Sequence, residues 1–266
     1  MSFDSLMSAA QRLSASMEAL AALGAELRLR REGLFAAPRV RQLLQEVVQG
    51  IDPKALDGLS ADQEATALAV IEGMFRHAID LLDKPARMSG WSYSDPSVLQ
   101  AMGLRSRRFV PHIEVLASRR SEVRDALQRP GALLDVGTGT GWLAIEAARA
   151  WAAWRVVGID RHEPALELAR ANVTASGMEG RVQLRRQSVE QLEDVEAFTI
   201  AWLPGPFLPP GIVAAALERC RRALLPGGWL VFGLRLPPSE PFGQALNALQ
   251  IVRDGGYPWT KTEIEE

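Results

Sequence analysis

The chain has 266 residues, of which 47 % are hydrophobic, and its formal net charge at pH 7 is −2. This length and composition are typical of a globular protein that buries one sizeable core. The 30 basic and 32 acidic side chains nearly balance, so the excess of positive charge that binds nucleic-acid phosphates is absent, and we expect no nucleic-acid partner. The single cysteine excludes an internal disulfide framework and a multi-cysteine zinc cluster, so we expect no metal.

The N-terminal segment lacks the basic stretch and the uninterrupted apolar run of a signal peptide. No apolar run elsewhere in the sequence is long enough to span a bilayer. The sequence therefore predicts a cytoplasmic protein without a membrane partner.

Helical spacing of apolar residues dominates the first 128 residues. Helices are predicted over residues 4–31, ending at Gly33, over residues 38–48, which open with proline, and over residues 60–82. Helical spacing resumes after residue 96 and continues to about Gln128. These residues are interpreted as an all-helical N-terminal region, 1–128.

A loop over residues 84–96 interrupts this helical region with two prolines and a glycine, and it presents Trp91 and Tyr93. Both aromatic residues are candidates for binding a substrate, and Tyr93 is favoured because its ring ends in a hydroxyl group. The alternative is that both side chains pack in a core and hold the loop in place.

From residue 129 onward, short apolar runs alternate with helical segments. This alternation predicts an α/β domain over residues 129–266 with a doubly wound, mostly parallel sheet. The strands are nearly continuous in apolar character, as expected when helices cover both faces of the sheet. Strands are predicted over residues 132–136, 154–160, 181–186, 197–203 and 228–234.

A glycine-rich segment closes the first predicted strand and precedes a helix that begins at Trp142. Glycines let a backbone turn sharply and approach a ligand, and the free N–H groups at a helix N-terminus favour an anionic ligand group. The segment therefore contributes the candidate ligand-binding residues Asp135, Gly137, Thr138, Gly139, Thr140 and Gly141.

The glycines fall as G-x-G-x-G just after an acidic residue, Asp135, and this spacing differs from the G-x-G-x-x-G of dinucleotide-binding enzymes. It resembles motif I of the class I S-adenosylmethionine-dependent methyltransferases, and Asp160 at the end of the next strand and the L-P-G-G turn before the last strand extend the resemblance over about residues 131–235. The resemblance implies a Rossmann-like fold and S-adenosylmethionine as cofactor. It implies that the glycine-rich loop receives the methionine part, that Asp160 binds the ribose hydroxyls, and that Arg161 and His162 lie along the adenine.

Two features depart from the family pattern. Ser188 stands where the third strand usually delivers an adenine-binding Asp, so adenine recognition is assigned to Ser188 and Val189, with Gln187 or the backbone as alternatives. The chain also ends where the family has two further strands. We therefore expect final strands to be missing, so that either another chain pairs with the exposed strand, giving an oligomer, or the natural protein is longer.

Aromatic residues follow the fourth predicted strand, where the family places residues that face cofactor and acceptor. Trp202 is assigned to cofactor binding and Phe207 to the acceptor. The segment is not an N-P-P-Y loop, so amide and exocyclic amine acceptors lose support, and an apolar or aromatic pocket is expected.

The combined expectation is methyl transfer to an oxygen atom of a small molecule, with the N-terminal helices as a lid and a homodimer surface. His112 is the candidate general base, whereas His77 is interpreted as a packed or solvated residue. Two alternatives stay open: a non-catalytic interaction module with the same fold, and a nicotinamide-dependent dehydrogenase.

Overall fold

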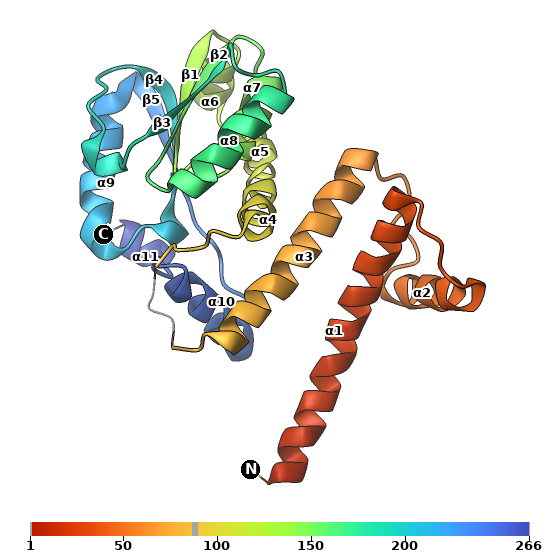
Figure 1. Cartoon of the computed structure of the whole chain (residues 1–266). Helices are drawn as coiled ribbons and strands as arrows, with labels where there is room; N and C mark the ends of the chain where they lie inside the picture. The colour runs from red at the N-terminus through yellow and green to blue at the C-terminus, as the bar shows by residue number, and fades with distance from the viewer. Residues whose placement is uncertain (1, 87–89, 266) are drawn as a thin grey trace. The chain divides into compact units, whose positions relative to one another are not determined.

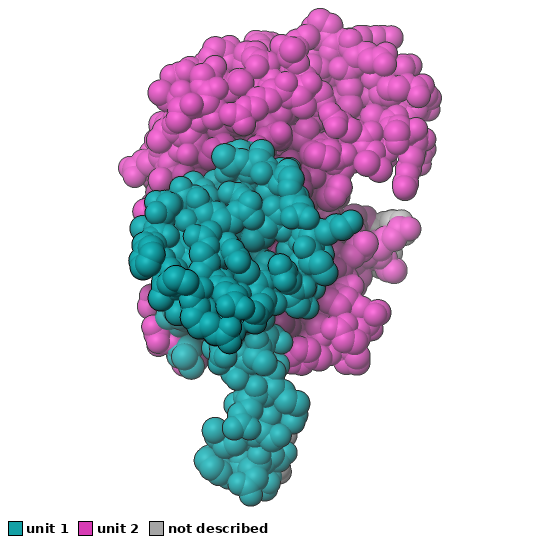
Figure 2. All heavy atoms as spheres, turned by 90° about the vertical axis from the view of Figure 1, so that its right-hand side faces the viewer, with its two compact units in different colours: residues 1–82 teal, residues 83–266 magenta. Residues whose placement is uncertain are grey.

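The computed structural model describes residues 2–86 and 90–265. The described residues form two compact units, residues 1–82 and 83–266 (Figure 2). Residues 87–89 of the predicted 84–96 loop lie outside the description, as does Glu266 at the end of the predicted C-terminal helix. The division between the units falls inside the region that the sequence pattern assigned to a single N-terminal part.

The first unit is helical, as predicted. It contains α1 (Phe3–Glu32), α2 (Pro38–Ile51) and the greater part of α3 (Ala61–Asp83). The helix α1 ends at Gly33, whose φ of 61° is a left-handed conformation that favours glycine. A core joins α1 to α3 through the buried side chains Leu27, Leu68 and Ile71.

The second unit begins with three helices that the sequence pattern had grouped with the N-terminal region. They are α4 (Pro96–Ser106), α5 (Phe109–Arg119) and α6 (Ser121–Leu127). Val110 and Ile113 of α5 are buried in the same core as the central strands. These helices therefore belong with the sheet, because burying the apolar face of α5 requires that surface.

In the part of the chain that the structure describes, five parallel strands form one sheet in the order β3-β2-β1-β4-β5 (Figure 1). The predicted doubly wound parallel sheet is confirmed. The first four strands match the predicted segments within one residue, whereas the fifth begins four residues earlier than predicted. Their bounds are β1 Gly131–Val136, β2 Trp154–Asp160, β3 Val182–Arg186, β4 Phe198–Pro204 and β5 Leu224–Gly233.

Helices cover both faces of the sheet. The helices α7 (Trp142–Ala150) and α8 (Glu163–Ala175) lie on one face, and α9 (Pro210–Ala223) lies on the other (Figure 1). The connecting helices change from one face of the sheet to the other between β1 and β4. The chain runs outward from β1 through β2 to β3 and then returns to the other side of β1 to form β4. Open α/β sheets bind ligands at the carboxyl ends of the strands at such a switch point.

Two more helices follow β5, namely α10 (Pro241–Arg253) and α11 (Lys261–Glu265). The sequence pattern predicted the start of α11 but did not identify α10. In the described sheet β5 pairs with β4 and lies at the edge. The indole Nε1 of Trp259, between the two helices, donates a hydrogen bond of 2.8 Å to the carbonyl of Leu208.

Gly158 of β2 has no side chain, and this leaves room for the loop after β1 to pack on the sheet. A Cβ at Gly158 would lie 2.6 Å from Oγ1 of Thr138 and 3.0 Å from Cδ2 of Leu184. We expect Gly158→Ala to lower the free energy of unfolding by about 1–3 kcal/mol, the usual cost of overpacking a core. Urea denaturation measures the change.

Gly180→Ala is the matched control, because a Cβ at Gly180 would meet open space. It should leave the free energy of unfolding within about 0.5 kcal/mol of the wild type. Equal stability of the two variants would contradict the described packing of Thr138 on β2.

Candidate functional site

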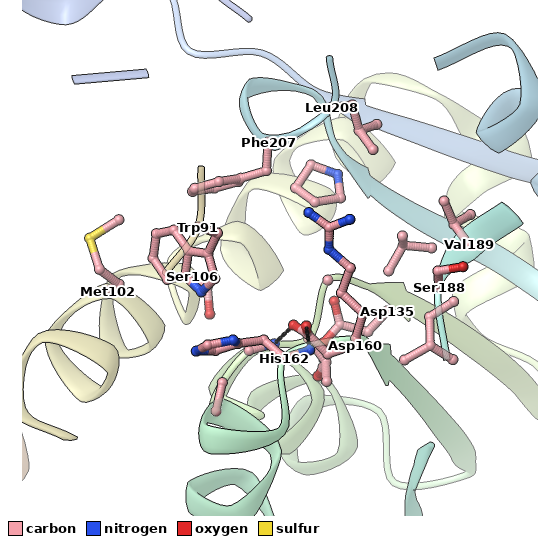
Figure 3. A pocket seen from close by; sticks show the side chains of 18 of the residues that line it. Trp91, Met102, Ser106, Asp135, Asp160, His162, Ser188, Val189, Phe207 and Leu208 are labelled. Carbon is pink, nitrogen blue, oxygen red and sulfur yellow. Dashed lines mark hydrogen bonds between the residues drawn. The ribbon is translucent and has the colours of Figure 1, made fainter. Parts of the chain in front are cut away.

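A cavity of about 520 Å³ lies at the carboxyl ends of β1, β2 and β4. It is lined by the last residue of each of these strands, namely Val136, Asp160 and Pro204. It therefore occupies the switch point of the sheet, where this architecture binds ligands. Figure 3 shows the side chains that project into it.

The glycine-rich loop between β1 and α7 makes the floor of the cavity. Gly137, Gly139 and Gly141 have φ angles of 66°, 55° and 77°, so all three adopt the left-handed conformation that favours glycine. The backbone N–H of Thr138 donates to the carbonyl of Ile159 at 3.0 Å and ties the loop to β2. The sharp turn predicted from the glycine spacing is therefore present.

The carboxylate of Asp160 joins the loop to the end of β2. Its Oδ2 accepts a hydrogen bond of 2.8 Å from the N–H of Gly139, and its Oδ1 accepts one of 2.8 Å from the N–H of His162. An ionised carboxylate has about four acceptor positions, so both oxygens keep capacity for a ligand in the cavity. Asp160 therefore has a structural role in addition to the ligand-binding role that the resemblance implies.

Asp135 lies under the loop and is almost fully buried. Burial raises its pKa to about 7, and the negative charge of Asp160 acts in the same direction. The hydroxyl of Thr138, which donates to Oδ2 of Asp135 at 2.6 Å, opposes the shift. The cavity therefore contains a carboxyl group whose proton is released near neutral pH.

The residues assigned to the adenine also line the cavity. Ser188 precedes a short 3-10 helix, η1 (Val189–Gln191), and Val189 is buried beside it. His162 lies across the cavity from them in Figure 3, with its Nε2 2.7 Å from the carbonyl oxygen of Tyr93. Arg161 lines the cavity as well, but its side chain is exposed.

The other end of the cavity is aromatic and apolar. The rings of Trp91 and Phe207 meet edge to face, with centroids 5.5 Å apart, and Met102 lies nearby (Figure 3). Trp202 is largely buried and packs on Phe109, with a centroid distance of 4.5 Å. One wall of the cavity is thus formed by residues from four places: the loop after β4, the segment before α4, and the helices α4 and α5.

Two predicted site residues are not brought to the cavity. Tyr93 is buried against Val98 and Leu99, so its ring is a core residue, as the alternative interpretation expected. Its ring contacts Trp91 edge to face, and its carbonyl oxygen lies 2.7 Å from Nε2 of His162. His112 is exposed on α5, beside the ring of Phe109, and does not line the cavity. The helix α5 turns Phe109 toward the cavity and His112 toward solvent.

Several lining residues lie outside every motif that the sequence analysis recognised. Ser106 and Phe109 come from the helices before the sheet, and Asp254 and Gly255 follow α10 at the far end of the chain. That Phe109 is aromatic is evident from the sequence. Only the packing of α4, α5 and α10, however, brings the four residues to one cavity.

The residues at the loop end fit the cofactor that the sequence resemblance implies. The hydroxyl of Thr140 is buried at the cavity and has no hydrogen-bond partner among the described residues. A Cβ at Gly139 would meet no side chain, so the loop leaves room for a ligand at its surface. Carboxylates, loop N–H groups and an apolar wall at Val189 together match an amino acid joined to a nucleoside.

Among the described residues no group of His, Cys, Asp and Glu side chains is arranged to hold a metal ion. None of the described helices has the length and apolar character needed to cross a membrane. The thiol of Cys220, a residue of α9, is buried in the core, and burial raises its pKa to about 12.

Comparison with known sequences supports the same interpretation. A family model described as a methyltransferase domain matches residues 133–228. A ribosomal protein L11 methyltransferase from Sorangium cellulosum is 36% identical over 99 residues, which cover 37% of this chain and 29% of that protein. A probable cobalt-precorrin-6B C(15)-methyltransferase (decarboxylating) from Pyrobaculum calidifontis is 32% identical over 139 residues, which cover 51% of this chain and 70% of that protein.

Solved structures resemble the chain over nearly its whole length. An O-methyltransferase family protein from Burkholderia thailandensis has a TM-score of 0.65 at 13% identity, covering 99% of this chain and 90% of that one. A mitomycin 7-O-methyltransferase has a TM-score of 0.56 at 15% identity, covering 98% of this chain and 90% of that one. At these identities the likeness establishes the fold.

The raised pKa of Asp135 predicts a pH dependence of stability. The folded state binds the proton more tightly than the unfolded state, whose carboxyl has its ordinary pKa of 3.8. The stabilising contribution of Asp135 is therefore complete below about pH 4 and is lost as the pH rises to about 7. Relative to Asp135→Asn, the wild type should lose stability across this window, measured by urea denaturation at each pH.

Thr138→Val provides the matched comparison, because it removes the hydroxyl that opposes the shift. Without this hydroxyl the pKa of Asp135 should be higher. Compared with the double variant Thr138→Val, Asp135→Asn, the Thr138→Val protein should therefore lose stability over a pH range that extends higher than that of the wild type. A stability difference between wild type and Asp135→Asn that does not change with pH would contradict the described burial of the carboxyl group.

Proposed function

Because the chain belongs to the class I S-adenosylmethionine-dependent methyltransferases, we propose that it methylates an oxygen atom of an aromatic small molecule. The observation that carries this proposal is that the cavity described above has two chemically different ends. One end contains the glycine-rich loop and Asp160, and the other end contains Trp91 and Phe207. Cofactor and acceptor would therefore meet in one enclosed space.

The loop end is assigned to the cofactor, S-adenosylmethionine. Backbone N–H groups of the loop at the N-terminus of α7 favour the methionine carboxylate. Asp135, once ionised, accepts hydrogen bonds from the ammonium group, and Asp160 accepts them from the ribose hydroxyls with the acceptor positions that Gly139 and His162 leave. Ser188, Val189, Arg161 and His162 then border the adenine.

S-adenosylmethionine supplies a methyl group already activated by its sulfonium sulfur. The chain's own residues mainly orient the two reactants and exclude water from the cavity, which is where most of the rate enhancement of such a transfer arises. The buried ring of Trp202, next to Phe109, forms a rigid wall of the cavity. A hydroxyl acceptor loses its proton as its oxygen is methylated, and with His112 exposed on α5 we do not assign it as the base.

The aromatic end supports a small, flat acceptor. Edge-to-face packing of Trp91 and Phe207 leaves ring faces and edges that favour aromatic contacts. The segment Pro204-Gly205-Pro206-Phe207 lacks the side-chain amide that an N-P-P-Y loop offers to a nitrogen acceptor. The structural neighbour that acts as a mitomycin 7-O-methyltransferase agrees with an oxygen acceptor.

The first unit is assigned a role in assembly. Val40, Leu43 and Val47 of α2 are exposed apolar side chains at helical spacing, which suits a surface that another copy of the chain covers. We retain the homodimer as a proposal on this ground, together with the role of the N-terminal helices as a lid.

The cofactor assignment predicts that Asp160→Ala lowers the affinity for S-adenosylmethionine by at least about a hundredfold. The variant removes a charged acceptor for two ribose hydroxyls, each hydrogen bond to a charged group contributing about 1.5–3 kcal/mol. It also releases the N–H of Gly139, so the loop loses one of its hydrogen bonds to the end of β2 and keeps the one from Thr138. Isothermal titration with S-adenosylmethionine measures the change.

Glu179→Ala is the control, since Glu179 is an exposed carboxylate outside the cavity, and it should bind the cofactor as the wild type does. Wild-type protein that binds NADH but not S-adenosylmethionine would favour a dehydrogenase. Binding of neither ligand at millimolar concentration would favour a non-catalytic module. Near wild-type affinity in Asp160→Ala would show that the cofactor binds elsewhere.

A further inference from the structure

The helix α4 forms part of the cavity wall and also packs on the helices beside the glycine-rich loop. Four of its residues line the cavity, namely Leu99, Met102, Gly103 and Ser106. Figure 3 shows Met102 and Ser106 on the side of the cavity that Trp91 borders. The same helix contacts α7, which begins directly after the loop, and α8, which follows β2. A single short helix thus touches both the cavity and the elements that carry the loop.

A pair of side-chain amides joins α4 to α8. Nε2 of Gln100, on α4, donates to Oδ1 of Asn172 at 3.0 Å, and Nδ2 of Asn172 donates back to Oε1 of Gln100 at 3.1 Å. The indole Nε1 of Trp142, the first residue of α7, donates to the same Oε1 at 2.7 Å. None of these three side chains lines the cavity, so they act on a ligand only through their neighbours.

The amide pair reaches the backbone of the glycine-rich loop. Nδ2 of Asn172 also donates to the carbonyl oxygen of Thr140, at 2.9 Å, so both of its hydrogens are used. Thr140 lies in the loop just before α7, and it lines the cavity. Holding its carbonyl therefore fixes how the loop enters the helix whose N-terminus faces the cavity.

A second contact between α4 and the loop lies three residues after Gln100, on the same face of α4. A Cβ at Gly103 would overlap Oγ1 of Thr140 and would lie 3.2 Å from Cδ1 of Trp142. Only a glycine allows this close approach. Gln100 and Gly103 therefore hold α4 against the loop at two points, one by hydrogen bonds and one by packing.

The hydrogen bonds of Gln100 lie in a partly buried place, which makes each partner depend on the others. A leucine at position 100 would leave the indole N–H of Trp142 and the amide of Asn172 without their partner, and an unsatisfied buried group costs more than a lost bond. A glutamate at position 100 would keep both acceptor bonds and lose only the donor. These two substitutions separate the acceptor role of Gln100 from the space that its side chain fills.

Resting on the assignment of the loop end to the cofactor in the proposed function, we propose that Gln100 is a positioning residue for the S-adenosylmethionine loop. Acting from α4 through Asn172, it holds the carbonyl of Thr140 and with it the loop in the arrangement that receives the cofactor. Coupling of this kind is reciprocal. A bound cofactor that fixes the loop therefore also fixes α4, and with it the position of Met102 and Ser106 in the cavity wall.

The test measures the affinity for S-adenosylhomocysteine by isothermal titration and the hydrogen exchange of the backbone amides of residues 99–106. In the wild type, saturating S-adenosylhomocysteine should slow this exchange. Gln100→Leu should lower the affinity at least about tenfold and should lose the slowing even at saturating ligand. Gln100→Glu should retain the slowing and keep the affinity within about threefold of the wild type, because the acceptor for Trp142 and Asn172 remains.

Glu146→Gln is the matched control. It weakens another connection between the same helices, the ion pair of 3.0 Å between Arg107, directly after α4, and Glu146 of α7, which does not involve the loop. This variant should keep both the affinity and the slowing. An equal loss of affinity in Glu146→Gln would show that any loosening of α4 has the same effect, and Gln100 would then be a structural residue.

The proposal is also overturned if Gln100→Leu binds as the wild type does, if slowing persists in that variant, or if the wild type shows no slowing. Should Gln100→Leu fail to fold, Trp142→Phe removes one donor to the same oxygen and should lower the affinity at least about threefold. Wild-type affinity in Trp142→Phe would then contradict the proposal. Failure of the wild type to bind S-adenosylmethionine, by contrast, would contradict the proposed function itself.

Discussion

The arrangement of the cavity depends on two hydrogen bonds to one carboxylate. Asp160 accepts from the N–H of Gly139 in the glycine-rich loop and from the N–H of His162 before α8. Hydrogen bonds to an ionised acceptor are roughly twice as strong as neutral ones, so this side chain holds a flexible glycine-rich turn against the end of β2. Together with the N–H of Thr138, which donates to the carbonyl of Ile159, this connection fixes the loop above Asp135 and the backbone at His162.

The two ends of the cavity are built in different ways. The loop end comes from consecutive segments, β1, the glycine-rich loop and the end of β2, which parallel pairing brings together at the switch point of the sheet. The aromatic end is assembled from the segment before α4, the loop after β4 and the residues after α10, which are far apart in the sequence. A methyltransferase can therefore keep its cofactor site while the more distant segments determine the acceptor, because the constraints on the two ends are separate.

Much of the sheet could be predicted because its signals are local. Apolar runs bounded by turn residues identify β1 to β4, and the glycine spacing with an acid at each strand end identifies the loop site. The helix α10 and the residues after it carry no comparable signal, so Asp254 was missed. His112 and Tyr93 were predicted to face a substrate because of their chemistry and their place in the chain. The direction of a side chain depends instead on which face of its element the core covers.

The sequence by itself determined the α/β architecture, the family and the residues of the loop end, since backbone periodicity and glycine conformation are properties of short segments. Only the tertiary structure decided where the chain divides into units, because α5 joins the core of the sheet and α4 packs on α7 and α8. Only the tertiary structure brought Trp91, Phe207 and Asp254 to one cavity. Contacts between distant segments depend on how whole helices pack, and packing is not encoded in the spacing of neighbouring residues.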